Sequence, residues 1–542
     1  MRRLSFAALC AFVAVSAGAQ TIPEALQYSE NNYYGTARSI ALGNAMTALG
    51  GDLGSIGINP AGGAVARYSQ FTVTPGVTLM TTNADYSCKN DLDYTNLTKT
   101  RMSKGALPNL GFNLRLDTGK RRGLKSVSFG FISNTTNKYF NEFVGRGTNP
   151  YTSMAGSFAY AATPFNPEDL INPDNYYDTN IPWNILLAYQ SAMIAEGLDD
   201  EGNVLVDGDG NLMYAGVSDI IDHNPEDDSY SIRSAGALDQ NSTVRKSGSK
   251  QDLVLNAAFN IDDRLYLGVN IGLPYGSFNY TESFREDAVD PSQFEIKYGD
   301  GVSTNFNTSN YQYEQVSDFS GIYAKLGVIF LPVPGLRIGA AVQTPTAMDI
   351  TDSWRVRAST KYSNSQYDTN AWSPENEFSY CLHTPWRFNF GLAGTIANIA
   401  LLSADFEFTD HSTMRFTNDR GDTNPFYNEN YDIIDYTGKQ YEARFGAELK
   451  VLPEIALRAG YTFKSRGDYY YDGTPVEGNT QSGSIGFGYS SAGSFFADFA
   501  FRFTKFYTDY FDPYADYFGG YLPETRYTRS LSDVVATIGW RF

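Results

Sequence analysis

The sequence predicts an all-β protein, a 14-stranded antiparallel transmembrane β-barrel with a plug of small residues inside it. Three observations lead to this prediction. Apolar and polar residues alternate with a period of two along many segments. Short connections alternate with long ones. No apolar stretch after residue 20 approaches the roughly 18 residues that a membrane-spanning helix requires.

Residues 1–19 have the pattern of a secretory signal peptide. Arg2 and Arg3 supply the positive end, residues 4–15 the apolar run, and residues 17–19 the small-residue cleavage site. Without the two arginines, the formal net charge of −19 becomes −21, so nucleic acid is not an expected partner. The mature chain would keep Cys88 and Cys381, and the sequence leaves open whether they pair or remain thiols.

Residues 20–66 are predicted to form the plug, or hatch. Residues 35–61 consist largely of Gly, Ala, Ser and Thr, and the alanines at 37, 41, 45 and 48 recur at helical spacing. A helix with so small a face cannot build its own core. We therefore expect the remainder of the chain, 67–542, to enclose this segment as a barrel.

The strand pattern favours a membrane barrel over a soluble sandwich. In residues 110–116 and 495–503, for example, apolar residues alternate with polar or small ones. Charges recur on the same parity of many strands, as they can where an interior wall pairs them with one another and with a plug. Fourteen strands are predicted, an even number, at 69–84, 104–117, 123–140, 250–261, 265–282, 318–331, 335–358, 378–395, 399–412, 439–450, 454–467, 480–490, 494–508 and 530–542.

The connections indicate which end of the barrel faces outward. Short turns are predicted at 117–123, 262–264, 332–334, 397–398, 452–453 and 491–493, and the seven other links are long and polar. This alternation is typical of bacterial outer-membrane proteins. The last strand alternates up to Phe542, so we expect the outer-membrane insertion machinery to recognise this end and the strand to close onto the first one.

A long extracellular insertion is expected at 141–250, where residues 183–196 read as a short helix. Ile185, Tyr189, Ala192 and Met193 would share one face of that helix. Two interpretations remain open: a groove that catches a hydrophobic ligand, or a helix packed on the barrel rim, since an apolar helical face is usually core.

The sequence contains no motif that is typical of a catalytic site. His223, His383 and His411 are isolated, without the spacing of metal ligands. Neither a G-x-S-x-G nucleophile motif nor a phosphate-binding loop is present. We therefore expect no enzyme activity, no cofactor and no metal.

Several segments resemble the FadL / OmpP1 / TodX family of outer-membrane transport proteins. The hatch pattern Gly35, Ala37, Gly43, Ala45, Asp52 followed by Asn59, Pro60 and Ala61 resembles that family's N-terminal hatch. Residues 106–112, 265–276, 336–345 and 457–462 resemble its second, fifth, seventh and eleventh strands, and the long insertion resembles Bacteroidetes-type members.

The resemblance implies passive uptake of a hydrophobic ligand across the bacterial outer membrane, with outer-membrane lipids as the other partner. The ligand itself, whether fatty acid, aromatic hydrocarbon or haem-like molecule, stays open. In the best-known members the ligand leaves beside a kinked third strand, but residues 133–137 contain no glycine to absorb a kink, which puts a lateral exit in doubt.

Asn59 is our predicted latch between hatch and wall, because a buried side-chain amide there needs partners. Two alternatives to uptake stay open: a FadL-like barrel that serves as a secretion or assembly partner, and an open porin.

Overall fold

The computed structural model describes residues 21–88, 94, 96–172, 174–178, 181–199, 202–207, 209–224, 229–297, 303–397, 399–491 and 493–542. The predicted signal peptide lies outside these residues. Within them, fourteen strands pair in antiparallel order and the last, β24 (Glu524–Arg541), pairs with the first, β1 (Gln70–Ser87), from Ser87↔Glu524 to Gln70↔Arg541. The barrel is therefore closed, and the predicted fold class is confirmed.

Ten other barrel strands are continuous: β2 (Asn96–Asp117), β3 (Leu124–Lys138), β9 (Leu238–Ile261), β10 (Leu265–Ala288), β12 (Ser303–Phe330), β18 (Ala400–Asp410), β20 (Lys439–Lys450), β21 (Ile455–Ser465), β22 (Asn479–Ser490) and β23 (Phe495–Phe511). Their ends at the short turns agree closely with the predicted ones. At the long-loop end, several strands run further than predicted. β12, for example, begins at Ser303 rather than at residue 318, because beyond the lipid belt the strands lose the apolar alternation that marks them in the sequence.

Two barrel strands are each made of two segments. β13 (Leu336–Gln343) continues as β14 (Ala347–Tyr362), and β16 (Asn376–His383) continues as β17 (Arg387–Ile396). Pro345 and Pro385 lie in the two interruptions, where the missing N–H breaks the ladder. Between the interruptions the Thr384 amide donates to the Thr346 carbonyl at 3.0 Å, so the wall stays joined there.

The barrel exterior carries an apolar belt of exposed side chains, among them Phe112, Phe129, Ile271, Leu326, Leu392, Phe445, Leu457 and Ile485. The residues that alternate with this belt on the same strands are polar, small or charged and are buried toward the lumen. A closed barrel with this outward belt crosses a membrane through its strands. No helix in the described ranges combines the length and the apolar character needed to cross a membrane.

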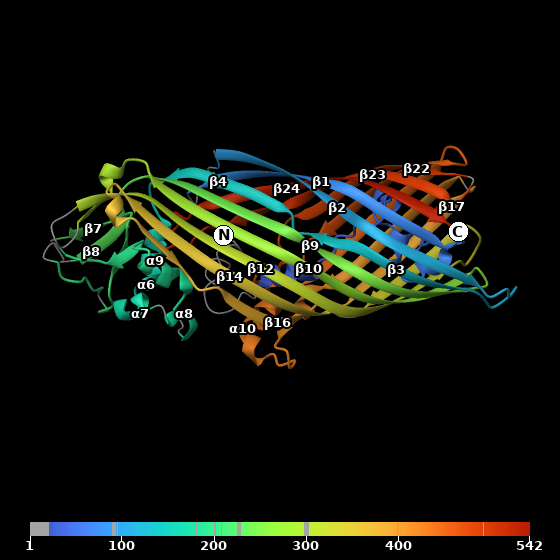
Figure 1. Ribbon diagram of the computed structural model, residues 1–542, viewed down its shortest axis with the longest axis horizontal. Helices are drawn as coiled ribbons and strands as arrows, with labels where there is room; N and C mark the ends of the chain where they lie inside the picture. The colour runs from blue at the N-terminus through green and yellow to red at the C-terminus, as the bar shows by residue number, and fades with distance from the viewer. Residues whose placement is uncertain are drawn as a thin grey trace.

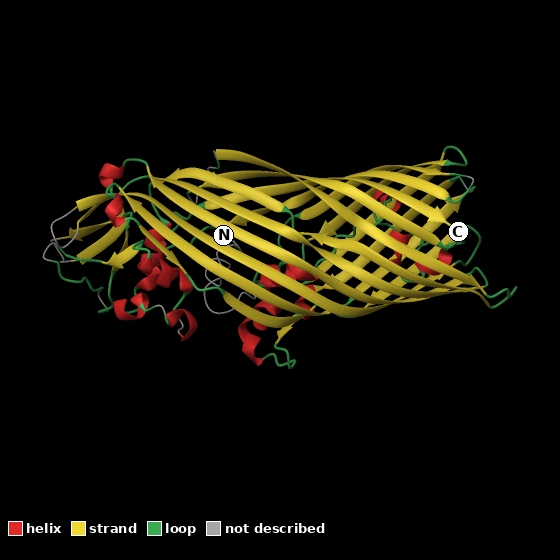
Figure 2. Ribbon diagram, in the orientation of Figure 1, coloured by secondary structure: helices red, strands yellow, loops and turns green. Residues whose placement is uncertain are grey.

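Residues 21–66 lie inside the barrel as short helices: α2 (Ile22–Ser29), α3 (Ala37–Ala41), α4 (Leu53–Ile56) and α5 (Gly62–Val65). Figure 2 shows these helices among the strands. The predicted small-faced helix is shorter than expected. It ends near Ala41 because Gly43 and Asn44 adopt left-handed backbone angles (φ 62° and 59°), so Ala45 and Ala48 follow in turns.

The insertion lies at the long-loop end (Figure 1). It contains β4 (Asn141–Asn149), α6 (Met154–Ala162), α7 (Pro167–Ile171), α8 (Asn175–Asp178), α9 (Trp183–Gln190), β5 (Ile194–Glu196), β6 (Tyr214–Gly216), β7 (Asp219–Asn224) and β8 (Ser229–Ser234). Other loops add β11 (Glu295–Lys297), β15 (Thr369–Trp372), β19 (Arg415–Thr417), α10 (Tyr427–Tyr436) and four 3-10 turns, η1 (Pro291–Gln293), η2 (Ser365–Tyr367), η3 (His411–Thr413) and η4 (Asn424–Phe426).

Candidate functional site

The hatch is seated against glycines of the barrel wall. Gly446 and Gly460 face Leu42 and Gly43, so a β-carbon on Gly446 would lie 2.6 Å from the Leu42 carbonyl oxygen. Gly339 and Gly391 face Thr47 and Ala48 in the same way. The small residues of the hatch and the missing side chains of the wall therefore fit each other, and this close approach explains the composition of the segment.

The motif residue Asn59 joins the hatch to two strands. Its Nδ2 donates to the carbonyls of Thr47 in the hatch at 2.7 Å, Val328 of β12 at 3.1 Å and Ala340 of β13 at 3.4 Å. Its Oδ1 accepts the Ala61 amide at 3.0 Å, which turns the chain after Pro60. The amide thus has the wall partners that burial demands, and its role as a latch stays a prediction.

The carboxyl end of α2 is bound by three buried cations from three strands. Lys250 of β9 donates to the carbonyls of Tyr28 at 2.6 Å and Glu30 at 2.7 Å. Arg387 of β17 donates to the Ser29 carbonyl, and Lys464 of β21 donates to the Asn31 carbonyl at 3.2 Å. The last carbonyls of a helix lack partners and carry negative partial charge, so these cations both satisfy and attract them. Sequence reasoning missed this contact because the three cations lie on three strands that are far apart in the sequence.

Two tyrosines beyond α2 pack on further wall cations. Arg444 lies 4.8 Å from the Tyr33 ring centroid, and Lys138 and Arg502 lie 3.9 Å and 4.2 Å from that of Tyr34. Wall carboxylates balance these charges: Asp533 pairs with Lys138 at 2.8 Å and with Arg502 at 3.1 Å, and Glu442 pairs with Arg444 at 2.7 Å. The hatch is therefore held by charge and aromatic contacts as well as by fit.

The third barrel strand bends inward beside the hatch. β3 pairs with β2 only up to Asn134↔Asn109, and its register with β9 shifts between Thr135 and Asn137. The chain continues as β4, which pairs with β9 while Thr98 of β2 donates its hydroxyl to the Val144 carbonyl. Among the described pairings, residues 96–108 of β2 have a strand partner only in β1.

The third strand therefore bends without a glycine, so the missing glycine is no obstacle to a bend, and the exit route stays a prediction. Where β3 leaves β2, its carbonyls lose their ladder partners, and the hatch replaces them. The Tyr34 amide donates to the Thr135 carbonyl at 3.0 Å and the Asn32 amide donates to the Thr136 carbonyl at 2.7 Å. Hydrogen bonds from the hatch thus satisfy the carbonyls of Thr135 and Thr136 at the bend.

On the long-loop side of the hatch, buried apolar side chains fill the lumen. Tyr28 of α2 contacts the rings of Tyr139, Phe278 and Phe319, with centroids 6.3, 6.1 and 5.3 Å away. The same cluster includes Ala25, Met348, Ile350, Tyr380, Leu382, Met414, Phe416, Phe426 and Ile433. Barrels that conduct ions have polar, water-filled interiors, so this apolar lumen is the candidate ligand site. The apolar lumen and the hatch seated against the wall glycines together define the architecture.

The chain is a closed, plugged transmembrane β-barrel.

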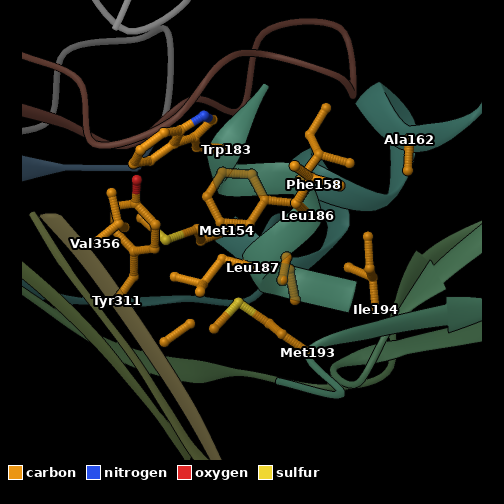
Figure 3. Packing of buried hydrophobic residues seen from close by; sticks show 14 of the residues in the cluster. Met154, Phe158, Ala162, Trp183, Leu186, Leu187, Met193, Ile194, Tyr311 and Val356 are labelled. Atoms are coloured by element: carbon orange, nitrogen blue, oxygen red, sulfur yellow. The ribbon is translucent and has the colours of Figure 1, made fainter. Parts of the chain in front are cut away.

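The insertion packs across the mouth of the plugged barrel. Its core joins α6 and α9 to the lumen-facing Tyr311 and Val356 (Figure 3). The structure places Ile185 and Met193 in this core, 2% and 1% exposed. The helix ends at Gln190, so the predicted helix 183–196 is too long and Ala192 (φ 49°) and Met193 fall outside it. This placement agrees with packing on the rim, and not with an open catching groove.

Cys88 and Cys381 are both thiols, so they are not joined to each other. In the part of the chain that the structure describes, no three His, Cys, Asp or Glu residues are grouped to hold a metal ion.

Comparison with known proteins gives matches only among solved structures. No family model and no curated protein matches the sequence. The plugged barrel is similar to the toluene transporter TodX of Pseudomonas putida, with 12% identity, a TM-score of 0.47 and coverage of 94% of this chain and 99% of that chain. It is also similar to a Pseudomonas aeruginosa FadL homologue, with 12% identity, a TM-score of 0.49 and the same coverage.

Proposed function

We propose that this chain is an outer-membrane channel of the FadL / OmpP1 / TodX family that takes up a hydrophobic small molecule without an energy source. The observation that carries the proposal is the apolar lumen that ends at the hatch helix α2. A ligand that leaves water for this lumen gains about 0.8 kcal/mol per buried methylene. Long-chain fatty acids and similar lipophilic compounds fit such a lining.

The bacterial outer membrane is the compartment that suits this barrel. The apolar belt, the short turns at one end and the long loops at the other support that placement. Phe542 ends the chain one residue after β24 and is 72% exposed. We keep its recognition by the insertion machinery as part of the proposal.

In the proposed mechanism, the hatch moves and opens a path beside β3. The Tyr34 and Asn32 amides release the carbonyls of the bent strand, and the ligand passes between β2 and the inward-turned segment. The bend, the unpaired edge of β2 over residues 96–108 and the hatch contact at Thr135 support a lateral exit. The ligand would then reach the membrane without crossing the rest of the lumen.

The test is ligand binding by the purified, delipidated barrel. Palmitate is expected to bind at about one molecule per chain with saturable affinity, as expected of a single apolar site. Mass spectrometry of the detergent-extracted protein identifies what is bound beforehand. An empty barrel that binds no amphiphile but retains a protein partner would favour the secretion or assembly role, and a large steady conductance would favour a porin.

Replacing the latch residue, Asn59→Ala, is expected to loosen the hatch and change the rate of ligand passage while the barrel still assembles. The variant loses the hydrogen bonds to the Thr47, Val328 and Ala340 carbonyls, and each lost hydrogen bond contributes about 0.5–1.5 kcal/mol. Uptake by proteoliposomes and heat-modifiable gel mobility measure passage and assembly. Asn260→Ala, at a turn contact with Asp263, is the control. Normal passage in Asn59→Ala would reject the latch.

The seating of the hatch is expected to weaken as the pH rises. Burial, and next the Asp352 carboxylate, raise the pKa of Glu24 to about 7. Glu24 therefore keeps a proton in the seated hatch and loses it when the hatch is released. Seating of the hatch becomes less favourable as the pH rises from about 4.5 to about 7. The groups around Glu24 are Thr21, Tyr28, Tyr313, Gln315, Asp352 and Tyr380.

Protease protection of residues 21–66 in detergent-solubilised barrel measures this effect across the pH range. The variant Glu24→Gln should protect its hatch equally at all these pH values. An unchanged pH dependence in that variant would assign the effect to another group.

A further inference from the structure

The loop between β18 and β20 holds a helix with three distinct faces. One face of α10 is fixed inward: the Asn430 side chain accepts the Phe416 amide at 2.7 Å and donates to the Phe416 carbonyl at 2.9 Å. On the same side, Ile433 is buried in the apolar cluster that contains Ala25 and Tyr28 of the hatch helix α2. The helix therefore covers the hatch from one side of the barrel.

A second face of α10 is apolar and exposed. Tyr427, Tyr431 and Ile434 are 71%, 53% and 50% exposed, and their spacing places them on one side of the helix. The acidic residues Glu429, Asp432 and Asp435 lie on a third side. A contiguous exposed apolar stripe beside an acidic one marks a contact surface and not a surface wholly in water.

The neighbouring barrel wall shows where this stripe lies relative to the membrane. An outward chain of aromatic rings runs across β17, β18 and β20: Trp386 to Phe388 (6.5 Å), Phe388 to Phe408 (6.4 Å), Phe408 to Tyr441 (5.6 Å) and Tyr441 to Phe406 (6.0 Å). Such aromatic girdles mark the membrane–water interface of barrels.

The loop that carries α10 begins at this girdle. Phe408 lies two residues before the end of β18 at Asp410, and Tyr441 lies two residues after the start of β20 at Lys439, about 7 Å along each strand. Figure 1 shows α10 projecting sideways from the wall and not over the open end of the barrel. The loop that carries the exposed stripe thus starts at the edge of the lipid-facing surface.

We propose that α10 is a membrane-surface helix whose Tyr427, Tyr431 and Ile434 lie in the headgroup region of the outer leaflet. Tyrosine suits this position because its ring is apolar and its hydroxyl reaches water. The acidic side remains in water. Because the opposite face packs against α2, contact with the lipid surface holds the loop over the hatch. The proposal concerns membrane contact and stands independently of what the barrel transports.

Site-directed fluorescence quenching tests the proposal. In a Cys88→Ser, Cys381→Ser background, Tyr431→Cys and the matched control Asp432→Cys are labelled with bimane and reconstituted in phosphatidylcholine vesicles that contain a headgroup-nitroxide phosphatidylcholine. Lipid quenching is expected to be at least about twofold stronger at 431 than at 432, because a surface helix buries its apolar face about 5–10 Å into the headgroup boundary. Iodide in the water should quench in the reverse order.

Labels at further positions distinguish a wrong proposal from a helix that the substitution has damaged. Ile434→Cys should repeat the behaviour of Tyr431→Cys, Leu457→Cys in the lipid belt should be strongly quenched by lipid, and Tyr160→Cys on the insertion should not. Equal lipid quenching at 431 and 432, with both belt and insertion controls as expected, would overturn the proposal.

Discussion

Replacing Gly460 by valine is expected to unseat the hatch and turn the plugged barrel into an open channel. Gly460 faces the lumen, and a β-carbon there would lie 2.5 Å from the Leu42 carbonyl carbon and closer still to the Gly43 amide nitrogen. Overpacking of this kind costs about 1–3 kcal/mol, which shifts the ratio of seated to released hatch about 5- to 150-fold. Single-channel recording in planar bilayers should show large, frequent openings that are rare in the unmodified protein.

A matched control comes from the neighbouring strand. Gly483 of β22 pairs with Tyr461 of β21, and a β-carbon on Gly483 would meet no atom within 4 Å, so Gly483→Val should keep the low conductance. Gly391→Val, which meets Thr47 of the hatch, should reproduce the open channel through a different contact. If both Gly460→Val and Gly391→Val assemble normally and stay closed, the close fit of hatch and wall does not block the lumen.

A disulfide between the hatch and β3 is expected to stop uptake reversibly. Tyr34 and Thr135 form an antiparallel bridge, and such pairs have Cα separations of about 4.5–5.5 Å, within the range of disulfides. The double variant Tyr34→Cys, Thr135→Cys, in a Cys88→Ser, Cys381→Ser background, should lose at least about tenfold in ligand uptake when oxidised, equivalent to ~1.4 kcal/mol. Dithiothreitol should restore it.

The control disulfide joins two strands of the wall that the proposed mechanism leaves in place. Thr351 and Ser379 are paired across β14 and β16, with their hydroxyl oxygens 2.9 Å apart. Thr351→Cys, Ser379→Cys should therefore transport equally well oxidised and reduced. Full uptake by the oxidised Tyr34–Thr135 variant would show that the ligand passes without release of the hatch from the bent strand.

Much of this architecture could be predicted because the sequence pattern of a barrel strand is local. The period of two in segments such as 495–503 records which side chains face lipid, and it required no knowledge of neighbouring strands. The hatch could be predicted for the same kind of reason, because a stretch of small residues cannot form its own core and must be enclosed by other segments. Asn59 was singled out by its motif, and its wall partners proved to be backbone carbonyls of β12 and β13.

The contacts that hold the hatch were not predictable in this way. Lys250 binds the Tyr28 carbonyl across 222 residues of chain, and the strand pattern reveals only that Lys250 faces inward. The bend of β3 was misjudged because its stability comes from hatch amides and not from a glycine in the strand. The helix at 183–190 was ambiguous because an apolar face has the same sequence whether it meets a ligand or a core.

The sequence by itself determined the barrel, the number of its strands, its lipid-facing parity and the presence of a small-residue hatch, because each depends on spacing within a short segment. Only the tertiary structure decided how the hatch is held, where the third strand leaves the wall, which loop covers α2 and which apolar faces remain exposed. Those features depend on which distant segments meet in the lumen, and that follows from closure of the whole barrel.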